Sequence, residues 1–248
     1  MNLEKVIAVR TDKTVYRDGD RCLKVFNEGY SKADVLNEAL NQARIEETGL
    51  NIPRVLEVTV IDGKWTIVSD YIKGKTLAQL MQENPEKKDE YLNLFVDLQL
   101  EMHSKTCPLL NKLKDKMNRK ICQTDLSATV RYDLHTRLES MPKHNKVCHG
   151  DFNPSNVIVG DDGQLYVCDW AHATQGSPAA DVATTYLLFA LNSKDQAEAY
   201  LELYCDRADM PMQVVRQWTS IVAASELARK RNVNDEFLKN WIDVVDYQ

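Results

Sequence analysis

The sequence has no long apolar segment, and this absence excludes several classes of protein. Among the 248 residues, no stretch approaches the roughly 20 apolar residues that a membrane-spanning helix needs. The first ten residues also lack the apolar core of a signal peptide. We therefore expect a cytoplasmic protein with no membrane partner.

Positive charge is also in short supply. The formal net charge is −6, from 31 lysine and arginine residues against 37 aspartate and glutamate residues. An acidic chain is poorly suited to a phosphate backbone, and the lysine-rich stretch 107–125 has no interleaved aromatic side chains on which bases would stack. We expect no nucleic-acid partner. The acidic balance either favours a neutral or cationic substrate or only keeps the protein in solution.

The six cysteines form no C-x-x-C pair. Two of them, Cys148 and Cys168, stand at apolar strand positions just ahead of acidic motif residues. This pattern is typical of reduced, buried thiols in a cytosolic protein, and its spacing does not favour a zinc site.

The most informative stretch is a polar loop followed by two short apolar runs. The runs 157–159 and 165–168 flank a glycine- and aspartate-rich turn, which predicts a β-hairpin. Asp151 lies in the loop, Asn156 precedes the first run, and Asp169 follows the second. The hairpin would bring Asn156 and Asp169 to the same end.

These three side chains suit phosphoryl transfer. The carboxylate of Asp151 can accept the proton of an attacking hydroxyl group. The amide oxygen of Asn156 and the carboxylate of Asp169 can hold Mg²⁺ on nucleotide phosphates, because Mg²⁺ prefers hard oxygen ligands. The alternative interpretation is a surface hairpin with ordinary Asx turns.

The same residues carry a resemblance to a known family. The motif His149-Gly150-Asp151-x-x-x-x-Asn156, followed by Asp169-Trp170, resembles the catalytic and metal loops of the aminoglycoside phosphotransferase and choline kinase-like superfamily. The resemblance implies an α+β, two-lobed protein kinase-like fold. Residues 1–72 would form a nucleotide-binding lobe with a small antiparallel sheet and one helix. Residues 73–248 would form a larger, mainly helical lobe with both loops and the acceptor pocket.

The start of the chain reads as three short strands, at 6–9, 14–17 and 21–26. Lys24 lies in the third strand between apolar residues; strand alternation alone would allow it to face solvent, whereas the resemblance implies contact with the α- and β-phosphates. The connection between the first two strands lacks the glycine-rich pattern of protein kinases. Thr11 and Lys13 either donate to phosphate there or belong to a plain surface hairpin.

A helix is predicted from Asp34 to Glu47 by its apolar spacing. The resemblance implies that an acid in this helix pairs with the strand lysine, and Glu38 is the candidate; an exposed helix acid is the alternative. After two further strands, 52–60 and 65–69, the segment from Asp70 resembles the interlobe connection of the family. The resemblance implies backbone hydrogen bonds from Asp70 and Ile72 to adenine.

The remaining chain is predicted to be mainly helical, at 85–106, 126–141, 181–191, 194–204, 211–229 and 234–245. His103 is interpreted as structural, and the resemblance implies that Asp181 braces the catalytic loop. Four aromatic residues either line an acceptor pocket, where a quaternary ammonium would bind by cation–π contact, or belong to the core: Trp170, Tyr186, Trp218 and Trp241. No protein-kinase activation segment follows Asp169, which favours a small-molecule substrate.

Together these features predict a magnesium-dependent kinase that transfers the γ-phosphate of ATP or GTP to a hydroxyl group of a small neutral or cationic acceptor. Asp151 is the expected catalytic residue, and Asn156 and Asp169 are the expected metal ligands. Lys24, Glu38, Asp70 and Ile72 are expected to bind the nucleotide. A choline, ethanolamine, sugar or ketosamine kinase of the same fold, or a non-catalytic nucleotide-binding regulator, remains an alternative. The sequence leaves the acceptor and the oligomeric state open.

Overall fold

The computed structural model describes residues 3, 5–228 and 235–242. The chain divides into two compact units, each of which contains two separate stretches of sequence. The first unit comprises Met1–Tyr91 with Pro154–Ala173, and the second comprises Leu92–Asn153 with Thr174–Gln248. The sequence predicts two lobes that are each one continuous stretch, residues 1–72 and 73–248. In the structure, the first unit runs to Tyr91 and also includes the hairpin within 154–173.

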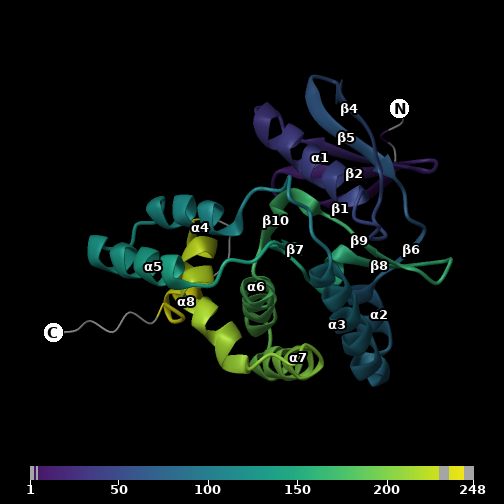
Figure 1. The fold of residues 1–248 in the computed structure, drawn as a ribbon. Coiled ribbons are helices and arrows are strands. Elements are labelled where there is room, and N and C mark those ends of the chain that lie inside the picture. Colours follow the sequence, from purple (N-terminus) through teal and green to yellow (C-terminus); the bar gives the residue numbers. More distant parts are fainter. Residues whose placement is uncertain (1–2, 4, 229–234, 243–248) are drawn as a thin grey trace. The chain divides into compact units, whose positions relative to one another are not determined.

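An antiparallel five-stranded sheet forms the centre of the first unit (Figure 1). Its strand order is β1-β2-β3-β5-β4, and each neighbouring pair is antiparallel. The strands are β1 (Lys5–Val9), β2 (Lys13–Asp18), β3 (Arg21–Phe26), β4 (Val55–Ile61) and β5 (Lys64–Asp70). The three predicted N-terminal strands are thus present, and each lies within two residues of its expected bounds.

The helix α1 (Lys32–Glu46) covers one face of this sheet (Figure 1). It begins two residues before its predicted start because Ser31 caps it, its side chain accepting a hydrogen bond from the Asp34 amide. Between helix and sheet lies a buried apolar cluster of Phe26, Val35, Ala39 and Ile67. Burial of this cluster fixes which face of α1 meets the strands, and hence where its polar residues lie.

A second, three-stranded sheet in the first unit contains the predicted hairpin. Strand β6 (Gly74–Thr76) pairs with β8 (Val157–Gly160), which pairs with β9 (Leu165–Val167). Gly74 has a φ of +155°, and a Cβ atom there would lie 2.1 Å from the carbonyl oxygen of Val159. Only glycine permits this close approach of β6 to β8. The short helices α2 (Leu77–Glu83), η1 (Pro85–Lys87), η2 (Pro154–Asn156) and η3 (Trp170–His172) complete the unit.

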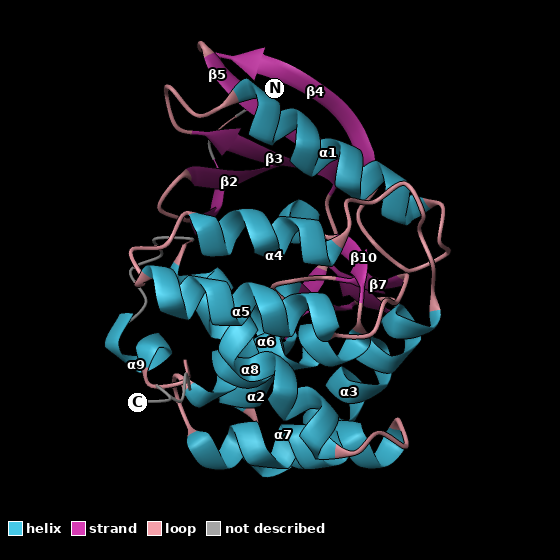
Figure 2. Ribbon diagram, turned by 60° about the vertical axis from the view of Figure 1, so that its left-hand side comes forward, coloured by secondary structure: helices cyan, strands magenta, loops and turns pink. Residues whose placement is uncertain are grey.

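The second unit is mainly helical (Figure 2). Its helices are α3 (Lys88–Ser104, which starts in the first unit), α4 (Leu113–Cys122), α5 (Ala128–Ser140), α6 (Pro178–Ala190), α7 (Lys194–Arg207), α8 (Met212–Leu227) and α9 (Asp235–Lys239). Helix α4 lies along α5, and α6 packs against α7 and α8. A small sheet of β7 (Lys146–Cys148) and β10 (Thr174–Gly176) lies beside α6. Parts of the last predicted helix, 234 and 243–245, lie outside the described residues.

Aromatic side chains fill the interior of the second unit. The ring of Phe95 stacks on that of Phe152 with centroids 4.4 Å apart, and it contacts Phe189 and Tyr200 edge-on. Contacts of this kind add about 0.5–1.5 kcal/mol each beyond the area they bury. The cluster therefore anchors Phe152, which follows Asp151 directly, in the core.

The structure also tests two expectations from the sequence, one about the cysteines and one about membrane-spanning helices. All six cysteines are free thiols, as expected. Three are buried and Cys22 and Cys168 are partly buried, but Cys122 is exposed, so the expectation of buried thiols is wrong for Cys122. Across residues 3, 5–228 and 235–242, no helix has the length and apolarity needed to cross a bilayer.

Candidate active site

Lys24 faces α1 rather than solvent. Its strand neighbours Leu23 and Val25 point to the opposite face of the sheet, where they pack with Val68. The Lys24 ammonium contacts the Glu38 carboxylate and lies 3.2 Å from Oδ1 of Asp169. Burial by itself lowers the pKa of Lys24, but Asp169 and Glu38 raise it more, so the pKa lies above its ordinary value. Lys24 is therefore a permanent cation held between two carboxylates.

Glu38 lies on the buried face of α1 and is only 3% exposed. This burial excludes the alternative interpretation of an exposed helix acid. A carboxylate is rarely this buried unless a cation compensates it. Here the compensating groups are the ammonium of Lys24 and, at 3.6 Å, that of Lys13.

Asp169 lies two residues after the end of β9 and has a left-handed backbone conformation, with a φ of 64°. Aspartate tolerates this region better than most residues, and such conformations gather at functional sites. The carboxylate is partly exposed, and its Oδ1 atom lies 3.2 Å from Lys24 and 3.4 Å from Lys13. The turn thus directs an acidic side chain towards two lysines from the five-stranded sheet.

Asn156 is held close to Asp169 by the backbone. The amide of Cys168 donates to the carbonyl oxygen of Asn156 at 2.8 Å, across the open end of the hairpin. The predicted convergence of Asn156 and Asp169 on one end of the hairpin is therefore present in the backbone. Each of the two residues carries a side-chain oxygen of the hard kind that Mg²⁺ prefers. Across the described parts of the chain, no cluster of three or more His, Cys, Asp or Glu could hold a metal ion.

The thiols beside this cluster are poor nucleophiles. Burial raises the pKa of Cys168 to about 12 despite the opposing effect of Lys24. Burial likewise raises the pKa of Cys22. Both sulfur atoms are therefore protonated near neutral pH, and the reactive groups of this region are the oxygens and the ammoniums.

Asp70 and Ile72, the predicted adenine contacts, lie at and just after the end of β5. The Asp70 carboxylate accepts hydrogen bonds from Arg54, including one of 2.7 Å from Nε, and its own amide donates to the Arg54 carbonyl oxygen at 3.0 Å. Because that amide is engaged, a backbone contact from Asp70 to a base would have to use its carbonyl oxygen. No backbone hydrogen bond between the Ile72 amide and another described residue is present.

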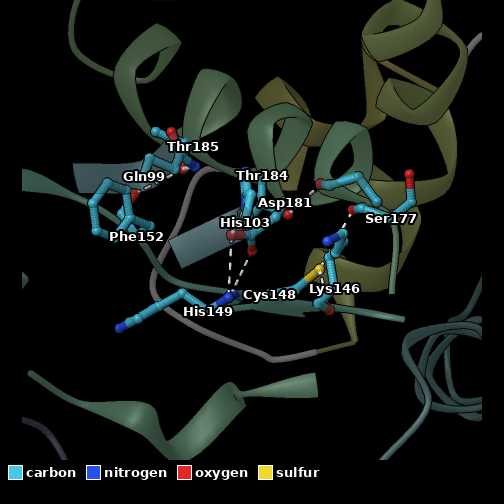
Figure 3. Close-up of polar contacts among 12 residues, drawn as sticks. Gln99, His103, Lys146, Cys148, His149, Phe152, Ser177, Asp181, Thr184 and Thr185 are labelled. Carbon is cyan, nitrogen blue, oxygen red and sulfur yellow. Dashed lines mark hydrogen bonds and ion pairs between the residues drawn. The ribbon is translucent and has the colours of Figure 1, made fainter. Parts of the chain in front are cut away.

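In the second unit, Asp181 holds the loop that carries Asp151 (Figure 3). One of its oxygens accepts from the Gly150 amide at 2.6 Å, and the other accepts from the His149 amide at 3.1 Å. The second oxygen also lies 3.1 Å from Nε2 of His103. Burial raises the pKa of Asp181. The contacts with His103, His149 and Gly150 together lower it by more than burial raises it, so the net pKa lies below its usual value.

Further contacts fix the loop on both sides of Asp151. The Asp151 amide donates to Nδ1 of His149 at 3.2 Å, and the side chain of Asn153 donates to the Asp151 carbonyl oxygen at 2.9 Å. Thr185 donates to the carbonyl oxygen of Phe152 at 2.9 Å. Hydrogen bonds to the backbone of Asp151 and of Phe152 therefore hold this loop in place.

The structure brings four predicted residues together within the first unit: Lys24, Glu38, Asn156 and Asp169. It adds Lys13, for which the sequence left phosphate binding and a plain hairpin open. The strand register, which the sequence alone does not give, explains the position of Lys13: it pairs with Phe26, whose ring packs against α1.

Of the four candidate pocket aromatics, Trp170, Tyr186 and Trp218 are buried, which supports their interpretation as core.

The five-stranded sheet with its ion-paired lysines and acids is the arrangement expected of a phosphotransferase with a kinase-like fold. A family model described as the phosphotransferase enzyme family, APH, matches residues 5–213, and the chain belongs to this family.

Solved structures agree with the predicted fold. An aminoglycoside phosphotransferase, APH(4)-Ia, in a ternary complex with AMP-PNP and hygromycin B is 16% identical, with a TM-score of 0.68 over 96% of this chain and 91% of that one. An aminoglycoside-3'-phosphotransferase of type VIII is 17% identical, with a TM-score of 0.65 over 90% and 92%. The choline kinase LicA from Streptococcus pneumoniae is 16% identical, with a TM-score of 0.59 over 98% and 90%. The predicted kinase-like fold and family are thus confirmed.

Proposed function

We propose that this phosphotransferase moves the γ-phosphate of ATP or GTP to a hydroxyl group of a small molecule. The observation that supports this most strongly is the buried contact of Lys24 with both Glu38 and Asp169. A permanent cation held between two acids, next to a hairpin that carries a further oxygen ligand, is suited to a polyphosphate and its metal ion. The AMP-PNP bound in the APH(4)-Ia complex supports a nucleotide as the phosphate donor.

Each residue of the cluster then has a role in nucleotide binding. Lys24 binds the α- and β-phosphates, and Glu38 keeps its ammonium on the phosphate side. Asp169 and Asn156 fit Mg²⁺, because this ion is usually held by one or two protein oxygens together with substrate phosphates. When bound, Mg²⁺ would supply neutralisation of phosphate charge. The carbonyl oxygen of Asp70 and the amide of Ile72 contact the base.

Asp151 orients the acceptor hydroxyl and takes its proton. Its carboxylate is carried by the loop that Asp181 and Thr185 hold in place. The loop therefore loses little conformational entropy when the acceptor binds. Most of the rate enhancement comes from this positioning and from charge neutralisation by Lys24, rather than from covalent chemistry.

The acceptor is a small molecule with a free hydroxyl group. The acidic net charge of −6 and the hygromycin B bound in the APH(4)-Ia complex support a cationic acceptor. The choline kinase among the similar structures supports an amino alcohol instead. We propose no nucleic-acid or membrane partner and a cytoplasmic location.

The test is nucleotide consumption by the wild-type protein with Mg²⁺ and a panel of hydroxyl compounds: aminoglycosides, choline, ethanolamine, sugars and ketosamines. We expect at least one acceptor to stimulate consumption. The variant Asp151→Asn should lose about 10²-fold or more of that rate while it binds AMP-PNP as tightly as wild type, because the residue acts on the acceptor. Equal rates in the variant and wild type would contradict the role of Asp151. Tight AMP-PNP binding without turnover on any acceptor would instead favour a non-catalytic regulator.

A further inference from the structure

Lys13 is a second buried lysine in the nucleotide cluster. It starts β2, is 8% exposed, and lies across from Phe26 of β3 in the register of the sheet. Its ammonium is 3.4 Å from Oδ1 of Asp169, the same oxygen that Lys24 approaches. It is also 3.6 Å from Oε2 of Glu38 and 5.6 Å from the centre of the Phe26 ring.

Charge balance shows what this second lysine is suited to. Two ammoniums and two carboxylates neutralise one another in this cluster. If Asp169 serves as a metal ligand, its carboxylate offers less charge to the lysines, and Glu38 alone remains to compensate both. One buried positive charge is then left without a full partner, which is costly unless an anion approaches. A polyphosphate is such an anion.

The turn before Lys13 explains why a side chain would be needed there. The first glycine of the sequence is Gly19, so the β1–β2 connection contains none. The connection is closed by a 2.8 Å bond from the Arg10 amide to the Lys13 carbonyl oxygen, and Asn27 holds the carbonyl oxygens of Thr11 and Asp12 at 2.9 Å each. The Arg10 amide is thus already engaged, and the turn has no glycine to give it the backbone freedom that glycine-rich phosphate-binding loops use.

We propose that Lys13 is a second phosphate-binding lysine, which acts with Lys24 on the same polyphosphate and supplies the positive charge that a glycine-rich loop would otherwise provide. The proposal rests on the proposed function, because it assumes a nucleotide at this cluster. Oδ1 of Asp169 contacts both ammoniums. In the complex, the phosphate oxygens take the place of that carboxylate as partner of Lys13.

The test compares the affinities of Lys13→Met, Lys64→Met and the wild-type protein for AMP-PNP and for adenosine, with Mg²⁺ present. Lys64 is the matched control, because it is an exposed lysine at the start of β5 in the same sheet. We expect Lys13→Met to weaken AMP-PNP binding about tenfold or more, because a charge-assisted contact to phosphate is lost. Adenosine binding should not change, and Lys64→Met should behave as wild type.

The outcomes separate the possible roles of Lys13. Unchanged AMP-PNP affinity in Lys13→Met, or an equal loss for AMP-PNP and adenosine, would overturn the proposal and leave Lys13 as a structural counter-ion. Failure of the wild-type protein to bind any nucleotide would overturn the proposed function and this inference together.

A second measurement needs no variant and therefore does not depend on how Lys13→Met folds. The wild-type protein is acetylated at low reagent concentration and the modification of each lysine is followed by mass spectrometry. AMP-PNP with Mg²⁺ should slow the acetylation of Lys13, whereas adenosine should not, because only the phosphates reach its ammonium. Equal rates of Lys13 acetylation with and without AMP-PNP would contradict the proposal.

Discussion

The variant Asp181→Asn tests the scaffold of the Asp151 loop most directly. The two oxygens of Asp181 accept from the amides of Gly150 and His149, and the residue is 2% exposed. An asparagine has only one acceptor oxygen, so in either orientation its NH₂ group faces one of these amides. One buried N–H then loses its partner, at about 1–3 kcal/mol, and the other bond loses its charge, at roughly 1 kcal/mol. We therefore expect a loss of about 2–4 kcal/mol in the free energy of unfolding.

Urea unfolding at pH 7, followed by circular dichroism, measures this loss. The matched control is Glu202→Gln, the same chemical change at an exposed position of α7 in the same unit, which should change stability by less than about 0.5 kcal/mol. Hydrogen exchange of the Gly150 amide provides a local measurement. Its protection should fall by about 30-fold or more if the loop loses at least 2 kcal/mol. A variant as stable as the control, with normal Gly150 protection, would refute the role given to Asp181.

The pH dependence provides a further check of the same reasoning. Because the folded-state pKa of Asp181 is lowered, its charge stabilises the folded protein above the unfolded-state pKa, near 4. That stabilisation is lost as the pH falls through the lower, folded-state value. The difference in stability between wild type and Asp181→Asn should therefore be constant near neutral pH and shrink below about pH 4. A difference that grows on acidification would contradict the assigned sign.

Two further predictions follow from other contacts. Iodoacetamide at pH 8 should modify the exposed Cys122 and leave Cys168, whose pKa burial raises to about 12, unmodified in the folded protein; peptide mass spectrometry measures both, and equal labelling would contradict the argument. Gly74→Ala should cost about 3 kcal/mol or more, because its Cβ atom would overlap the Val159 carbonyl oxygen at 2.1 Å. Thermal unfolding measures that loss, and Gly63→Ala, which meets no atom within 4 Å but shares a positive φ, is the control for backbone strain alone.

The sequence was most informative where a motif and its local structure coincide. The turn between the two apolar runs fixes the β8–β9 hairpin, and hairpin geometry alone places Asn156 near Asp169. The pairing of Lys24 with Glu38 was predicted from the family resemblance, and the packing of the apolar face of α1 on the sheet brings the two side chains together. Short-range pattern and family resemblance pointed to the same residues in each case.

Other features depend on packing that the sequence does not display. Lys13 joins the cluster because β2 pairs with β3 in one register, and a slip of one residue would turn its side chain to the other face. The stretch 107–125 is conspicuous in the sequence for its lysines rather than for an apolar run. It contains α4, whose buried Leu113, Met117 and Ile121 recur every four residues among the charges.

The two-part composition of the first unit has a consequence for how the protein is made. Residues 1–91 are synthesised well before 154–173, yet β6 pairs with β8 and the lysines of the sheet pair with Asp169. During translation the N-terminal segment must therefore remain incomplete, with two ammoniums sharing Glu38 alone, until the hairpin has left the ribosome. A fragment ending at residue 91 would be an unfinished structure, and a minimal nucleotide-binding fragment would need the hairpin joined to it by a new linker.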